Sequence, residues 1–152
     1  MSKAIQSFAT IYNNPFIFVP LFAEFYASLG IKPKSVLASY VVLPLCLHAE
    51  TRKFFTNARK TSTLHTFTRE RSRLYGLPER VARYRSLTNT TLQHGFNLEE
   101  LQLGADLSIH ARAPRACDFC PAESAKAARN LGNIVAPFDM VTLYRVLGIK
   151  SL

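Results

Sequence analysis

The hydrophobic pattern of the first thirty residues predicts a helix. Asn14-Pro15 places an N-cap residue before a proline, which is a common helix start. The apolar residues that follow recur at steps of three and four, as one buried helix face requires. They are Phe16, Val19, Phe22, Ala23, Tyr26 and Leu29. Gly30 is a typical stop for this helix, and Pro20 would kink or restart it.

A second helix is predicted from Pro33 to Leu47, with Ser35 as a possible cap. Its apolar residues lie on nearly all sides rather than in one stripe. A helix of that kind belongs in the middle of a core.

Three shorter helices are predicted in the next segment. Ser62 could cap a helix over residues 63–71, a second begins at Pro78, and Thr88 or Asn89 caps a third that ends near residue 100. Each of these starts rests on a capping residue or a proline at the first turn.

A β-hairpin is predicted directly after these helices. Leu101 and Leu103 alternate with polar neighbours, residues 104–106 supply a turn, and Leu107 and Ile109 alternate again. Short helices followed by a two-stranded hairpin are the order of elements in a winged helix-turn-helix. We therefore predict a winged-helix-like segment here.

The last part of the chain predicts a connector and two helices. A helix runs from Ala122 until Pro137 ends it, and Asp139 caps a short final helix that Gly148 stops. The expected fold is one domain, mainly α with a small β-hairpin. In it, N-terminal core helices (residues 11–50) and a connector with C-terminal helices (residues 112–152) wrap a winged-helix-like segment (residues 51–111).

Composition and charge narrow the class of protein. The chain has 152 residues, of which 48% are apolar and 19% charged, which is a globular composition. Its two longest apolar runs are too short for a membrane span and contain prolines, and its three cysteines suggest no disulfide framework. We expect a cytoplasmic protein without a membrane partner.

The positive charge is concentrated in one segment. The formal net charge is +9, and residues 51–85 hold ten of the nineteen basic side chains against two glutamates. The arginines proposed as a contact patch are Arg69, Arg71, Arg73, Arg80, Arg83 and Arg85. They either bind phosphates or an acidic partner, or form the solvated faces of two helices. We favour the patch, but charge alone does not separate nucleic acid from protein carboxylates.

The composition of the predicted helix over residues 89–100 is unsuitable for reading DNA bases. The helix contains no Lys or Arg and ends in Glu99-Glu100, which would be repelled by phosphates. We hypothesise that this segment, including Glu99 and Glu100, makes protein contacts instead.

No catalytic, nucleotide or metal motif is complete. The chain has no glycine-rich phosphate loop, so no cofactor is expected and any ATP chemistry belongs to a partner. Cys117-x-x-Cys120 is half of a zinc site, and no second close pair accompanies it. We therefore assign no metal, although a partner chain could supply further ligands.

Five segments together resemble a known family over almost the whole chain. They are residues 12–15 (YNNP), 42–52 (VLPLCLHAETR), 61–65 (TSTLH), 128–132 (ARNLG) and 141–149 (VTLYRVLGI). In order and spacing they are similar to the middle component of three-component ABC systems, specifically the accessory subunit of Lamassu-type anti-phage defence.

The resemblance implies a non-catalytic subunit. It would bridge an SMC-like ABC ATPase and an effector nuclease and hold the effector until phage DNA is sensed, so that DNA is contacted through the complex. The polar residues that match the family are His48, Arg52, Ser62 and His65. With no nucleophile or carboxylate pair beside them, we expect structural roles, with His48 closing the buried helix and Ser62 capping the next, and a partner contact for Arg52. The alternative function is a stand-alone basic winged-helix DNA-binding protein.

Overall fold

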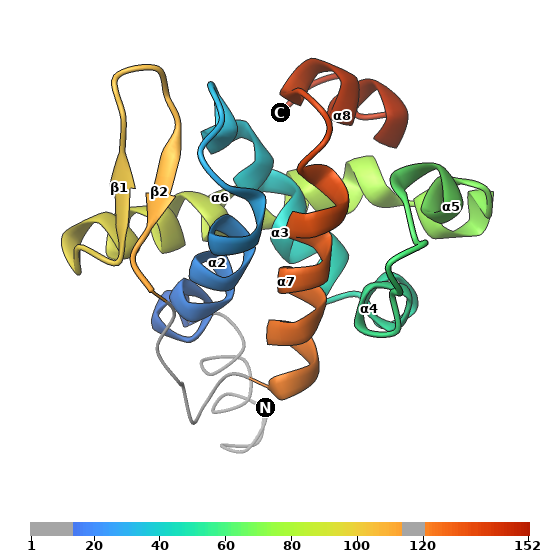
Figure 1. The fold of residues 1–152 in the computed structure, drawn as a ribbon, viewed down its shortest axis with the longest axis horizontal. Coiled ribbons are helices and arrows are strands. Elements are labelled where there is room, and N and C mark those ends of the chain that lie inside the picture. The colour runs from blue at the N-terminus through green and yellow to red at the C-terminus, as the bar shows by residue number, and fades with distance from the viewer. Residues whose placement is uncertain (1–13, 114–120) are drawn as a thin grey trace, which may run out of the picture.

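The computed structural model describes residues 14–113 and 121–152, which form a mainly helical fold with one small hairpin (Figure 1). The α-helices are α2 (Pro15–Leu29), α3 (Ser39–Cys46), α4 (Ala49–Thr56), α5 (Leu64–Thr68), α6 (Leu77–Asn97), α7 (Ala122–Val135) and α8 (Met140–Leu147). Two 3₁₀-helices, η1 (Ser35–Ala38) and η2 (Arg71–Leu74), and the strands β1 (Leu101–Leu103) and β2 (Ile109–Ala111) complete it.

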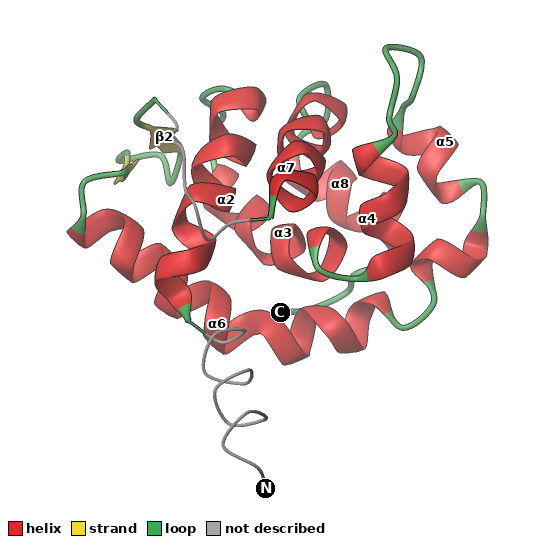
Figure 2. Cartoon of the chain, turned by 90° about the horizontal axis from the view of Figure 1, so that it is seen from below, coloured by secondary structure: helices red, strands yellow, loops and turns green. Residues whose placement is uncertain are grey.

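One hydrophobic core joins the two ends of the chain. Helix α2 packs on α7, and both α2 and α3 pack on α6. Buried side chains of this core run from Phe18 to Ile149. Helix α6 crosses the molecule along its longest dimension, with the hairpin near its C-terminal end and α5 beyond its N-terminal end (Figures 1 and 2).

The predicted first helix is confirmed at both ends. The Asn14 side chain accepts a hydrogen bond from the N–H of Phe16 at 3.0 Å, and Gly30 follows the helix with a φ of 78°, which favours glycine. The helix is continuous through Pro20, so it does not restart there.

The predicted second helix is divided, and Ser35 does not cap it. Residues 35–38 form η1 before α3 begins. Ser35 is fully buried, and its hydroxyl accepts the N–H of Ile109 at 2.9 Å. Tyr26 donates its hydroxyl proton to the carbonyl of Ser35 at 2.7 Å. Ser35 therefore links α2 to the hairpin instead of starting a helix, while every residue of 41–46 is buried as expected.

The prediction of two helices between residues 78 and 100 is wrong, because α6 is a single helix of 21 residues. Thr88 and Asn89 lie within it, and Thr88 is fully buried. The buried face that contains Val81 continues through Thr88 to Leu92, so the helix continues past the residues expected to cap a new one. The separate third helix that the winged-helix prediction requires is therefore not formed.

The hairpin is confirmed, but its loop is longer than predicted, because Leu107 lies in the loop with a φ of 62° and the second strand begins at Ile109. β1 and β2 are antiparallel, with Leu101 opposite Ala111 and Leu103 opposite Ile109. Its far end is tied to the N-terminal part of the chain, because Lys34 and Val36 donate their N–H groups to the carbonyls of Asp106 and Leu107.

The C-terminal helices also agree with the prediction. Helix α7 ends two residues before Pro137, and the Asp139 carboxylate accepts the N–H of Thr142 at 2.7 Å at the start of α8. Gly148 ends α8 with a φ of 73°. Within the described ranges, no helix is both long and apolar enough to cross a bilayer.

Candidate interaction surface

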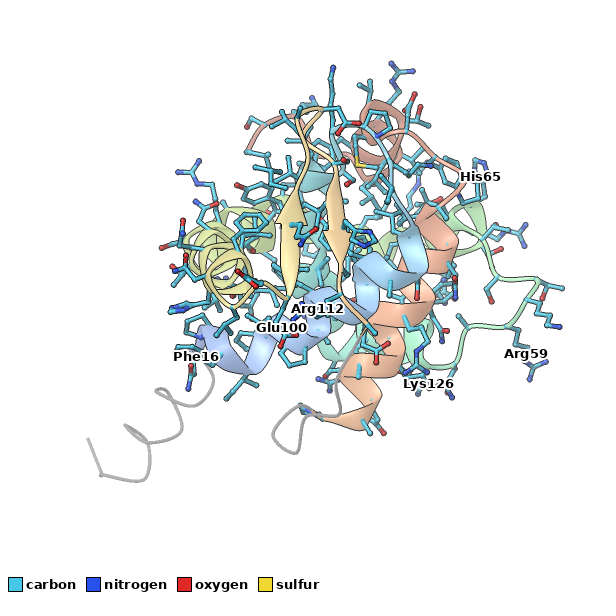
Figure 3. The ribbon with its side chains drawn as sticks, turned by 60° about the vertical axis from the view of Figure 1, so that its left-hand side comes forward. Phe16, Arg59, His65, Glu100, Arg112 and Lys126 are labelled. Carbon is cyan, nitrogen blue, oxygen red and sulfur yellow. The ribbon has the colours of Figure 1, made fainter. Side chains whose placement is uncertain are left out.

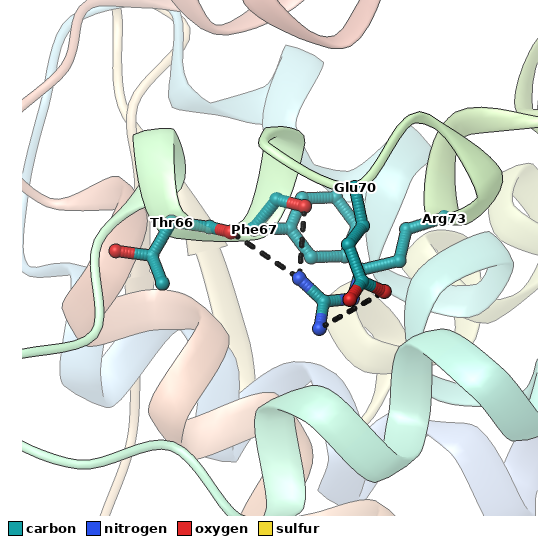
Figure 4. A network of polar contacts seen from close by, with 4 residues as sticks. All are labelled: Thr66, Phe67, Glu70 and Arg73. Carbon is teal, nitrogen blue, oxygen red and sulfur yellow. Dashed lines mark hydrogen bonds and ion pairs between the residues drawn. The ribbon is translucent and has the colours of Figure 1, made fainter.

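Arg73 fixes the short segment that leads into α6. Its Nη1 donates to the carbonyl oxygens of Thr66 and Phe67, both at 3.2 Å, at the end of α5 (Figure 4). Its guanidinium lies 4.5 Å from the centre of the Phe54 ring, and its Nη2 lies 3.5 Å from a carboxylate oxygen of Glu70. A cation at a helix C-terminus and over an aromatic face is stabilising. Arg73 is thus a structural residue here rather than part of an open patch.

Arg80 lies below the surface, with 8% of its area exposed. Its Nη1 donates to the carbonyl oxygen of Tyr75 at 2.9 Å, while its buried Nε and Nη2 have no hydrogen-bond partner within the described structure. Burial lowers the pKa of Arg80, and the charge of Arg83 acts in the same direction. Arg80 therefore holds the Tyr75 backbone and leaves an unpaired positive charge beneath it.

Tyr75 is the most exposed large apolar side chain among the described residues, at 86%. Three exposed arginines lie near it along the chain: Arg69 lies two residues before η2, Arg71 is the first residue of η2, and Arg83 lies one turn after Arg80 in α6. The ion pairs found in the described ranges join Arg73 to Glu70 and Arg129 to Glu24, so none of the three has a carboxylate partner there. We call Tyr75 with these three arginines the Tyr75 surface.

The six arginines predicted as one patch are not all brought together. Arg73 and Arg80 are engaged as described, and Arg85 lies about 160° around the helix axis from Arg83. Arg85 lines a different hollow of about 500 Å³, together with Lys150. Arg52, on α4, is half-buried. The basic segment therefore divides into separate regions.

Glu99 and Glu100 lie at the opposite end of α6, beyond its last residue. At 1.5 Å per residue the helix is about 30 Å long. Glu99 is exposed and has a φ of 57°, and the Glu100 carbonyl accepts the N–H of Arg112 at 2.9 Å. Figure 3 shows Glu100 and Arg112 side by side at the base of the hairpin, far from Arg59. Leu98, exposed at 50%, adds an apolar side chain to this end.

The polar residues that match the family pattern have different surroundings from those expected. The buried helix ends at Cys46, so His48 does not close it and instead precedes α4. Burial and the charge of Arg80 lower the pKa of His48. The prediction for Ser62 is also wrong. Thr63 caps α5, and the Ser62 hydroxyl accepts the N–H of Arg59 at 2.9 Å.

His65, another of the residues that match the family pattern, is exposed on α5. Its ring lies edge-on to the ring of Phe138, with the centroids 6.1 Å apart. His48, Ser62 and His65 thus contact different partners, and the structure does not assemble them into one site.

The sequence did not single out Glu50 or Phe54, which lie on α4 and line a hollow of about 460 Å³ with residues of the loop after α4 and of η2. The lining residues are Glu50, Lys53, Phe54, Asn57, Ser62, Glu70, Ser72 and Arg73. No local motif marks this set, because it is formed only when η2 folds against α4.

Cys117 and Cys120 lie outside the described residues. Among residues 14–113 and 121–152, no three His, Cys, Asp or Glu side chains are grouped so that they could hold a metal ion. His110, which precedes this pair in the sequence, is exposed on β2.

The described residues define a small helical protein with a basic, aromatic surface at one end of a long central helix. The chain belongs to the ABC-three component (ABC-3C) system Middle Component 3 family, whose model matches residues 2–151. The resemblance to a middle component of three-component ABC systems is therefore confirmed, and membership implies partner components in a complex. No curated protein and no solved structure gives a significant match.

Proposed function

We propose that this chain is a non-catalytic, cytoplasmic subunit that bridges the ATPase and effector components of its ABC-3C system. In this proposal the ATPase is SMC-like, the effector is a nuclease, and the system is of the Lamassu type. The subunit holds the effector inactive until phage DNA is sensed.

The observation that carries this proposal is the difference between the two ends of α6. The Tyr75 surface lies at one end and the Leu98-Glu99-Glu100 turn at the other, about 30 Å apart by the rise of an α-helix. α6 is one uninterrupted helix, and α2 and α3 pack against it. Two distant and chemically different surfaces at the ends of one helix suit a protein that contacts two partners at once.

A reconstitution with the other two components tests the proposal. The chain is co-expressed with both, with a tag on one of them, and complexes are isolated by affinity and size exclusion. We expect a three-part complex with the wild type, loss of one component with Glu99→Lys/Glu100→Lys, and loss of the other with Arg71→Glu/Arg83→Glu. Arg85→Glu, which removes a positive charge from the other side of α6, is the matched control and should assemble normally.

The bridging role would be refuted if the ATPase and effector associate equally well without this chain. It would also be refuted if the two pairs of substitutions release the same component. The stand-alone DNA-binding alternative gains no support, because the expected base-reading helix is part of α6 and the exposed face of that part carries no cation. That face presents Ser86, Asn89, Thr90, Gln93 and Asn97.

A further inference from the structure

We infer that the Tyr75 surface is a docking site for an acidic protein surface on one of the partner components, with Tyr75 as its central anchor. This inference rests on the proposed function and names the chemistry of one of its two contacts. The occupant is a folded protein patch rich in Asp and Glu with a recess for an aromatic ring.

The exposed position of Tyr75 is fixed by its backbone. Arg80 donates to its carbonyl oxygen at 2.9 Å, and the Tyr75 N–H donates to the carbonyl of Ser72 at 3.3 Å. Gly76 follows with a φ of 71°, which turns the chain into α6. An aromatic side chain presented by an ordered backbone loses little freedom on binding, so more of the contact energy appears as affinity.

The composition of the surface is that of a binding hot spot. Tyrosine and arginine dominate the residues whose truncation weakens protein interfaces most. Here an exposed tyrosine lies within eight residues along the chain of Arg69, Arg71 and Arg83, none of which is engaged by a carboxylate in the described part of the chain. Their donors are free for bidentate contacts with Asp or Glu.

The buried Arg80 adds a positive charge beneath the Tyr75 surface, of the same sign as its exposed arginines. Arg80 is buried, has two nitrogens that hydrogen-bond to nothing within residues 14–113 and 121–152, and is screened less by water than an exposed arginine. Residues 69–83 hold five arginines against Glu70, which is paired with Arg73, and Glu79. Glu50 on α4 is the other carboxylate whose charge acts on Arg80. Because the arginines outnumber these carboxylates, the field outside Tyr75 is positive and the complementary partner is acidic.

The arrangement of the cations favours protein over nucleic acid as the source of negative charge. A phosphate backbone is normally followed by a row of cations, and single strands also need several stacking rings. The positive side chains of the Tyr75 surface come from one short stretch of the chain, residues 69–83, that also carries one exposed ring, and they do not continue along the polar face of α6 that starts at Ser86. A short basic stretch with a single ring matches a compact acidic patch.

The experiment measures the affinity of the full chain for each purified partner component by biolayer interferometry at several salt concentrations. For one component, Tyr75→Ala should weaken binding by about tenfold or more, as expected of a hot-spot residue. Arg71→Glu and Arg83→Glu should weaken it similarly and reduce its dependence on salt. Arg85→Glu and Arg59→Glu are matched controls on other surfaces and should bind like the wild type.

The outcomes separate this inference from the proposed function. If the wild type binds neither component, the inference and the proposed function are both overturned. If it binds both and Tyr75→Ala binds as tightly as wild type, the inference is overturned and the bridging role stands. If the substitutions instead abolish binding to a short DNA duplex and spare the components, the surface is a nucleic-acid site and the inference is again overturned. Thermal unfolding of each variant, expected near that of the wild type because the changed residues are exposed, shows that lost binding is not lost folding.

Discussion

The Arg73 guanidinium lies 4.5 Å from the centre of the Phe54 ring and 6.0 Å from that of Phe67. The three aromatic rings Phe54, Phe55 and Phe67 also contact one another, with centroids 4.9–5.2 Å apart. Arg73 thus covers an aromatic cluster formed by α4 and α5 and binds the last carbonyls of α5 at the same time. One side chain fixes the orientation of the segment that presents Tyr75.

Arg73→Lys should lower the free energy of unfolding by about 1–2 kcal/mol, since lysine keeps the charge but loses the planar contact and the paired donors. Chemical denaturation followed by circular dichroism measures this. Arg71→Lys, two residues away and exposed, should change stability by less than about 0.5 kcal/mol. Equal effects of the two substitutions would show that the Phe54 contact adds nothing.

Gly132→Ala should destabilise the protein by about 1–3 kcal/mol through overpacking. A Cβ at this position would lie 2.5 Å from the carbonyl oxygen of Phe25 and 2.8 Å from the Cβ of Ser28, where α2 and α7 meet. Backbone atoms cannot move aside as a flexible side chain could. Asn133→Ala, at the next and exposed position, is the control, and thermal melting of the pair gives the comparison. A Gly132→Ala variant as stable as the wild type would mean that α2 and α7 separate easily.

Tyr26→Phe should cost about 1–3 kcal/mol, because it leaves the buried Ser35 carbonyl without a donor and the buried Ser39 hydroxyl without its acceptor. The Tyr26 hydroxyl bonds to the carbonyl of Ser35 and to the hydroxyl of Ser39, and burial raises its pKa far above the ordinary value. Tyr40→Phe removes a hydroxyl that bonds to Asn89 at an exposed position, and should cost less than about 1 kcal/mol. Denaturant midpoints of the two variants should differ accordingly, and a larger loss for Tyr40→Phe would contradict the assignment.

Arg80→Met should raise the pKa of His48. Burial and the Arg80 cation both disfavour the imidazolium form, so removal of the cation leaves burial as the main cause of the lowered pKa. A histidine with a lowered pKa in the folded state favours unfolding as the pH falls through its unfolded value of 6.5, and this acid sensitivity should become smaller in the variant. NMR titration of His48 measures the shift, and Arg85→Met should leave it unchanged. An unaltered His48 pKa in Arg80→Met would show that the charge of Arg80 does not reach it.

The sequence by itself determined the elements whose ends are set by local chemistry. Asn14 and Asp139 cap α2 and α8 through hydrogen bonds to N–H groups two or three residues away, and Gly30 and Gly148 end them in conformations that glycine favours. The existence of the hairpin also followed from local alternation, although its second strand begins at Ile109 rather than at Leu107. The five matching segments also sufficed to identify the family, since membership is a property of the sequence.

Only the tertiary structure decided the features that depend on contacts between distant residues. Thr88 could cap a helix, but burial of its side chain keeps α6 continuous. The sequence pointed to Ser62 as the cap of α5, but in the structure the N–H of Thr66 bonds to the Thr63 hydroxyl and Ser62 bonds to the N–H of Arg59 instead.

The candidate surface also depends on contacts between distant residues. Six arginines look equivalent along the chain, yet packing buries Arg80, places Arg73 over Phe54 and turns Arg85 away from Arg83. Local hydrogen bonds act over a few residues and can be predicted from them. The exposure of a charge depends on which segments fold over it, and that is settled only when the whole core has packed.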